Sequence, residues 1–210
     1  LNTYSGTDSL SSYERIKRMY EHKDADRIPI VDYPWAGTIA RWINEGMPAD
    51  IDWRDYFGTD KIETVFIDIS PRYEEKIIEK TKDYTISTSS WGVTMKNFNV
   101  PDSTPEFLDF KVTGPNQWEE AKKRMTIDEN RINWRFLEDN FSKWRDSGRW
   151  IEAGFWFGFD VSHSWMAGTE NFLIALMEEP DWVKDVFDTY LKSCIKHFDM
   201  IWEAGYRFDG

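Results

Sequence analysis

Short apolar runs without polar alternation constrain the fold of this chain more than any other feature. Three such runs cover residues 28–33, 64–69 and 150–157, and a fourth begins at 206–209. Runs of this length that are apolar on both faces are typical of buried parallel strands. Helical segments separate them, as the crossover between parallel strands requires. The pattern predicts an α/β protein.

Two α/β architectures compete, a doubly wound sheet and a (β/α)₈ barrel. No glycine-rich phosphate loop follows the first run, where a dinucleotide-binding fold would carry it. Asp32, Asp68 and Asp209 end three of the runs, and a barrel gathers its active site at the carboxyl ends of its strands. We therefore expect a (β/α)₈ TIM barrel. Because four strands are half of eight, residues 1–210 are expected to form one incomplete domain, its N-terminal half.

Helix signals fall between the runs. Ser11 and Glu14 have the spacing of a capping box, which predicts a helix start. The residue pattern changes around Gly92. Thr, Ser and apolar residues there predict an antiparallel ribbon over 84–100. The expected helices cover 11–22, 38–45, 116–125, 131–145, 170–177 and 181–203.

Composition excludes several classes of function. The chain has 26 basic and 38 acidic residues, a formal net charge of −12, and its basic residues are interspersed with acidic ones. A nucleic-acid partner is therefore not expected. No apolar run is long enough to cross a bilayer, so no membrane partner is expected either. The single Cys194 excludes an internal disulfide and an all-thiolate zinc site, which suits a cytoplasmic protein.

Aromatic residues are unusually frequent. They make up 17% of the chain and include 12 Trp. Core packing accounts for most of them in the simpler interpretation. Because Trp often lines pockets where one ring edge stays polar, an aromatic cavity for a flat or apolar ligand is the functional interpretation.

Several segments, taken in order, resemble the uroporphyrinogen decarboxylase superfamily, which includes corrinoid-dependent methyltransferases. Residues 13–16 (Tyr-Glu-Arg-Ile) and 26–30 (Asp-Arg-Ile-Pro-Ile) resemble its opening helix and first strand. Further similar segments lie within 58–68, 91–110 and 168–180, so the resemblance runs from about residue 11 to the end. It implies a (β/α)₈ barrel with its site at the strand carboxyl ends.

Asp68 is the first candidate catalytic residue. It interrupts an apolar run near its end, where burying an unpaired carboxylate is costly. The decarboxylase aspartate at the matching place contacts the pyrrole N–H groups of the substrate, which implies the same role here. The alternative is a structural Asp68 that caps a helix or pairs with an arginine. Asp32 ends the first run in the same way and is a candidate substrate-binding residue with the same alternative.

The loop after the first run departs from the decarboxylases. The resemblance places their arginine-bearing loop at 33–38, but Pro34 and Thr38 stand at the arginine positions. Arginine holds carboxylates through two parallel hydrogen bonds, so a substrate with many carboxylates would lack these anchors. Trp35, in the same loop, is a candidate substrate-binding residue.

Residues 157–165 follow the third run and are expected to lie over the barrel mouth. His163 is a candidate catalytic acid or base, with a structural hydrogen-bonding role as the alternative. Ser164 falls near a substrate-contacting tyrosine of the decarboxylases. Asp160, Ser164 and Trp165 are therefore candidate substrate-binding residues, and core packing is the alternative for Trp165.

Zinc and a corrinoid are the cofactors that the methyltransferase resemblance implies. Its zinc ligands lie in the second half of the family barrel, beyond Gly210, so no metal ligand is predicted within this chain. The missing arginines favour corrinoid-linked methyl transfer over cofactor-free decarboxylation of uroporphyrinogen. A non-catalytic small-molecule-binding barrel is a third reading. The expected partner is a small-molecule or corrinoid-protein substrate, and a homodimer stays open.

Overall fold

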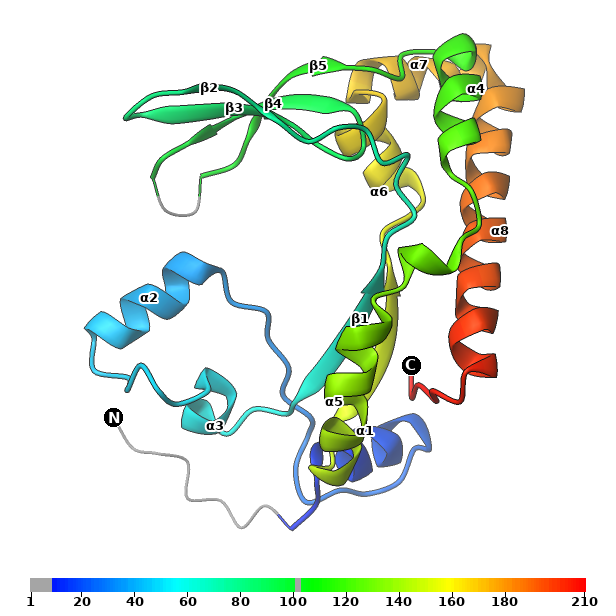
Figure 1. Cartoon of the computed structure of the whole chain (residues 1–210). Helices are drawn as coiled ribbons and strands as arrows, with labels where there is room; N and C mark the ends of the chain where they lie inside the picture. The colour runs from blue at the N-terminus through cyan, green and yellow to red at the C-terminus, as the bar shows by residue number, and fades with distance from the viewer. Residues whose placement is uncertain (1–8, 101–102) are drawn as a thin grey trace. The chain divides into compact units, whose positions relative to one another are not determined.

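The computed structural model describes residues 9–100 and 103–210 (Figure 1). Contacts divide the chain into two compact units. The first unit contains the chain up to Val65, Asn133–Gly154 and Arg207–Gly210, and the second contains Phe66–Ile132 and Phe155–Tyr206. Among the described residues, no helix combines the length and apolar character needed to span a bilayer.

The strands form two separate sheets. β1 (Ile62–Ile67) pairs in parallel with β6 (Trp150–Phe155). The other sheet is antiparallel, in the order β2 (Ile77–Lys80), β3 (Tyr84–Thr88), β4 (Val93–Phe98) and β5 (Glu106–Phe110). The ribbon predicted around Gly92 is confirmed as the β3–β4 hairpin.

The predicted N-terminal half of a (β/α)₈ barrel is wrong. The parallel sheet has two strands and the larger sheet is antiparallel, whereas half a barrel needs successive parallel strands. Residues 28–33 and 206–209 belong to neither sheet. Ile28 is 82% exposed, so the first apolar run is not a buried strand. An apolar run becomes a strand only where neighbouring strands take up its backbone N–H and C=O groups.

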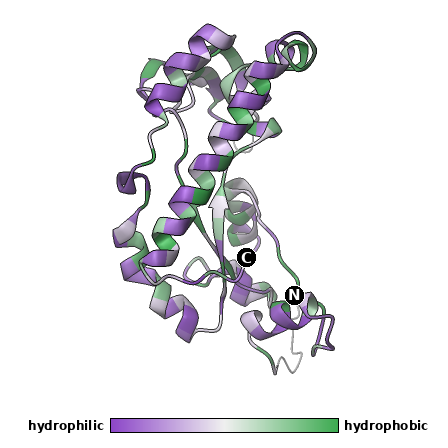
Figure 2. Ribbon diagram, turned by 90° about the vertical axis from the view of Figure 1, so that its right-hand side faces the viewer, coloured by the Kyte–Doolittle hydropathy of each residue, from purple (hydrophilic) through white to green (hydrophobic). Residues whose placement is uncertain are grey.

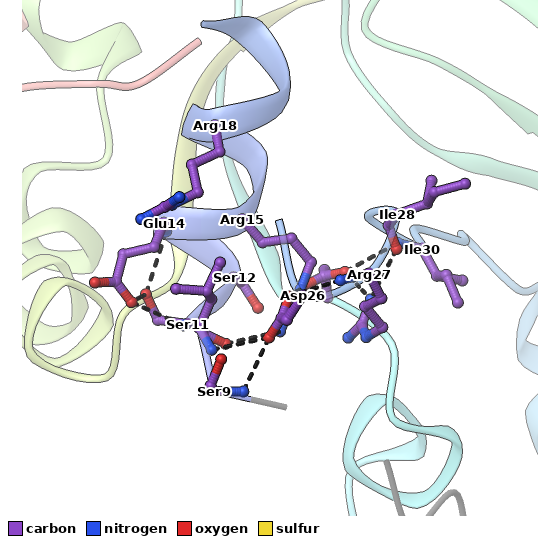
Figure 3. Close-up of polar contacts among 12 residues, drawn as sticks. Ser9, Ser11, Ser12, Glu14, Arg15, Arg18, Asp26, Arg27, Ile28 and Ile30 are labelled. Carbon is purple, nitrogen blue, oxygen red and sulfur yellow. Dashed lines mark hydrogen bonds and ion pairs between the residues drawn. The ribbon is translucent and has the colours of Figure 1, made fainter. Parts of the chain in front are cut away.

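The predicted helices are confirmed, with ends within a few residues of those expected. Ser11 caps the first of them, its Oγ accepting from the Glu14 backbone N–H (3.2 Å) while the Glu14 carboxylate accepts from Ser11 N (2.9 Å) (Figure 3). They are α1 (Ser12–Tyr20), α2 (Ala36–Asn44), α4 (Pro115–Arg124), α5 (Trp134–Asp146), α7 (Thr169–Glu178) and α8 (Pro180–Glu203). Short elements that periodicity does not predict are α3 (Trp53–Phe57), α6 (Phe159–Val161), a 3₁₀ turn (Glu129–Arg131) and a π-helical turn (Ser162–Met166).

A buried carboxylate links the parts of the first unit. The Asp60 side chain has no exposed surface and pairs with Arg15 of α1 and with Arg27 (2.6 Å). It also accepts from the Ile30 backbone N–H (2.9 Å). Arg15 in turn contacts Asp26 through Nε (2.7 Å), as Figure 3 shows. These ion pairs join α1, the extended segment after it and the residues before β1.

Helices α4 and α8 pack together in the second unit. Asp185 of α8 accepts hydrogen bonds from Trp118 Nε1 (2.7 Å) and Lys122 Nζ (2.6 Å) of α4. Tyr190 is fully buried, and its ring lies 5.9 Å from that of Trp91. In Figure 2 the long helix α8 carries both hydrophobic and hydrophilic residues along its length, as an amphipathic helix does.

Substitution of Arg15 by Ala is expected to lower the free energy of unfolding by about 3 kcal/mol, because it removes one of two guanidinium groups from a fully buried carboxylate. Urea denaturation measures the loss. Arg18→Ala, an exposed site in the same helix, is the matched control and should cost less than about 1 kcal/mol. Equal losses in the two variants would contradict a structural role for the Asp60 cluster.

The ion pair between Arg15 and Asp26 also predicts that the free energy of unfolding depends on pH. The Arg15 hydrogen bond, with help from the backbone N–H groups of Leu10 and Ser9, holds the pKa of Asp26 well below its usual range. The unfolded chain therefore binds more protons in acid, and this stabilisation is present above about pH 5 and lost as the pH falls below about 4. Denaturation midpoints measured from pH 6 to 2 should fall more steeply for the wild type than for Asp26→Asn. Parallel curves would refute the linkage.

Candidate functional site

A cavity of about 290 Å³ lies in the second unit, at the end of β1. Asp68 supplies the only charged side chain among the described residues that line it. The cavity therefore sets one carboxylate among apolar and aromatic groups. Its lining consists of Phe66, Ile67, Asp68, Ile69, Trp91 and Trp156.

Asp68 directly follows the last residue of β1, and its side chain is 41% exposed. Its Oδ1 accepts from the Ser70 backbone N–H (2.9 Å), and its Oδ2 accepts from Arg72 Nε (2.6 Å). Burial raises the pKa of Asp68, but the hydrogen bonds from Arg72 and Ser70 outweigh it and bring the pKa below its usual value. Asp68 is thus charged at neutral pH. It both pairs with Arg72, as the structural alternative expected, and lines the cavity.

A buried arginine holds the turn that carries Asp68. Arg131 is 4% exposed, and its Nη1 donates to the backbone oxygens of Asp68 (3.1 Å) and Ser70 (2.8 Å). Its Nη1 also lies 3.9 Å from the Asp68 carboxylate. Burial lowers the pKa of Arg131, as does nearby Arg72, while Asp68 opposes the shift. The position of Asp68 therefore depends on Arg131, which the sequence does not mark.

Two tryptophans form the aromatic part of the wall. The Trp91 and Trp156 rings lie 6.3 Å apart at 83°, so an edge of one meets the face of the other. Trp91 is buried and precedes Gly92, which has a φ of +87°. A Cβ there would lie 2.7 Å from the Tyr73 ring, so glycine is required. Trp156 comes directly after β6 and is 38% exposed.

The candidates of the 157–165 segment lie in two consecutive helical elements. Asp160 belongs to α6, and His163, Ser164 and Trp165 belong to the π-helical turn that follows it. His163 Nδ1 lies 3.1 Å from Thr169 Oγ1 and 3.2 Å from Ser164 Oγ. Its Nε2 lies 3.7 Å from an Asp160 carboxylate oxygen. The contact with Thr169 joins the turn to the first residue of α7. It is the structural hydrogen bond that was the alternative role for His163. Trp165 stacks edge to face on Trp156 (4.8 Å) and so supports the cavity wall from outside the lining.

The other two candidates lie in the first unit. Asp32 lines a cavity of about 240 Å³, and its Oδ1 accepts from the Tyr33 backbone N–H (2.8 Å). Trp35 precedes α2 and is 55% exposed, outside that cavity. Arg54 lines the cavity, but it is engaged by Asp52 (2.7 Å) and by Glu63 (2.9 Å).

Groups that could bind a metal do not converge in the part of the chain that the structure describes. There, no set of three or more His, Cys, Asp or Glu side chains is placed to hold an ion. Cys194 is buried, and this burial raises the pKa of its thiol to about 11. It is therefore protonated at neutral pH and is a poor nucleophile.

Comparisons with protein-family models, with curated proteins and with solved structures give no match to this chain. Its function has to be inferred from its own residues.

Proposed function

We propose that the chain is an enzyme of the uroporphyrinogen decarboxylase superfamily that transfers a methyl group to or from a small molecule bound in the Asp68 cavity. The observation that carries the proposal is an exposed, charged carboxylate in a cavity that is otherwise apolar and aromatic. The order of the family-like segments supports it. The lone cysteine supports the cytoplasm as the compartment.

The cavity favours a flat, uncharged ligand with a hydrogen-bond donor. Asp68 accepts an N–H or O–H group, and the Trp91 and Trp156 rings offer apolar contact to a ring. A free cation is less suited, because Arg72 and Arg131 already offset the charge of Asp68. At about 290 Å³, the cavity is at the small end of ligand sites.

The implied cofactors do not fit this cavity. A corrin macrocycle is too large for about 290 Å³, and the described residues offer no zinc ligand cluster. The role of these residues is therefore to bind and orient the small molecule and to exclude water from it.

Decarboxylation of uroporphyrinogen is the second candidate, because Asp68 can accept from pyrrole N–H groups. A substrate with many carboxylates also needs cationic anchors. The described residues that line the Asp68 cavity include no cationic side chain. Methyl transfer is therefore preferred.

Asp68→Asn tests the proposal. Transfer of the methyl group from methylcobalamin to catechol, a flat uncharged acceptor with O–H donors, is followed as the methyl ether by chromatography. The rate should fall at least about tenfold, since the charge that orients the ligand is lost. Asn keeps the Oδ1 acceptor for Ser70, and the pair with Arg72 is exposed, so the unfolding free energy should fall by less than about 1 kcal/mol.

Asp139→Asn, an exposed aspartate of α5, is the matched control and should leave the rate unchanged. An inactive wild type would contradict methyl transfer. A large stability loss with an unchanged rate in Asp68→Asn would make Asp68 purely structural.

Incubation with uroporphyrinogen separates the two candidate reactions. Chromatography should detect no coproporphyrinogen, because the described lining of the Asp68 cavity offers no cationic anchor for the carboxylates of the substrate. Turnover near about 1 per second or faster would favour decarboxylation instead.

A further inference from the structure

We propose that an arginine-lined cavity in the first unit binds the phosphate group of a small organic ligand. This cavity has a volume of about 350 Å³ and is separate from the Asp32 cavity of the same unit. Its side chains come from α1, from the end of α5, from the residue before β6 and from 207–209. They are Tyr13, Arg145, Arg149, Arg207 and Asp209.

The charge of the lining opposes the charge of the chain. Three guanidinium groups face one carboxylate, an excess of two positive charges in a chain with a net charge of −12. Arg149 also pairs with Glu63, and Arg207 has contacts of its own within the chain. Asp209 is itself engaged, since its Oδ2 accepts from Arg145 Nη1 (2.5 Å) and from the Ile151 backbone N–H (2.9 Å). Arginines therefore outnumber carboxylates three to one in the lining, and an anion would meet the N–H donors that Arg145 and Arg149 do not use in these pairs.

The arginines are held in place without being saturated. Arg145 donates through Nη1 to Asp209 and through Nη2 to the Arg207 carbonyl, and its guanidinium lies 5.4 Å from the Phe141 ring centre. Arg149 pairs with Glu63 through Nη1 and donates through Nε to Ser147 Oγ (3.2 Å). A guanidinium carries five N–H donors, so each keeps donors for a ligand. Fixing them beforehand reduces the entropy lost on binding.

The donor set selects an oxyanion. Guanidinium groups have no acceptor, and their planar fork matches two oxygens of a phosphate. Tyr13 adds an aromatic ring to the lining, and the Arg145 guanidinium lies 5.9 Å from the centre of that ring. A cavity of about 350 Å³ also has room for an organic part beyond the phosphate itself. The ligand class that fits is a small phosphate monoester.

Isothermal titration calorimetry of the full chain at low salt tests the site, with glycerol phosphate, inorganic phosphate and succinate as probes. Glycerol phosphate should bind with a Kd below about 1 mM and should bind more tightly than succinate. Arg149→Gln should weaken glycerol phosphate binding at least about tenfold, since it removes a charged donor. Arg135→Gln, which removes the same charge from a side chain that is 91% exposed on α5, should leave the Kd unchanged.

Circular dichroism confirms that each variant is folded. If Arg149→Gln does not fold, Arg207→Gln serves in its place. Absence of binding at about 10 mM glycerol phosphate would overturn the site. Equal weakening in Arg135→Gln would show a general charge effect instead, and succinate binding as tightly as the phosphates would overturn the phosphate assignment.

Discussion

The first unit depends on one carboxylate that has no exposed surface. Burying a charge costs several kcal/mol unless partners surround it, and Asp60 has Arg15, Arg27 and the Ile30 backbone N–H. These partners come from two pieces of chain, α1 and the extended segment that holds Arg27 and Ile30, so the charge is satisfied only when both pieces are in place around Asp60. The segment around Ile30 is therefore held by polar contacts and not by a sheet, which explains how its apolar side chains stay exposed.

A buried cation has the corresponding role in the second unit. Arg131 satisfies its guanidinium with backbone oxygens of Thr126 and Arg124 as well as with those of Asp68 and Ser70. Because four carbonyl contacts fix one rigid plane, the turn after β1 has little freedom. The Asp68 carboxylate is thus presented to its cavity in a set position before any ligand arrives, which is the arrangement that precise binding requires.

Local signals in the sequence predict local structure well, and pairing between distant segments poorly. The Ser11 capping box predicts α1 because both halves of the signal lie within one turn. The barrel prediction failed because the run 28–33 is apolar enough for a strand, yet whether it pairs depends on distant partners such as Asp60. At the candidate site, Asp68 could be predicted from its place at a strand end. Trp91, which lines the cavity, and Arg131, which holds the turn behind it, could not, because they come from other parts of the chain, although Gly92 marks a tight turn beside Trp91.

The two proposed sites differ in how charge is used. Beside Asp68, cations offset the carboxylate, so the cavity selects by shape and by a single hydrogen bond. In the arginine-lined cavity, Arg145 and Arg149 are each paired with one carboxylate, and the cavity selects through the guanidinium N–H donors that remain. The net charge of −12 does not prevent anion binding there, because salt at physiological strength screens exposed charges beyond about 8 Å. A ligand phosphate therefore responds to the guanidinium groups it touches, while the acidic surface farther away mainly slows its approach.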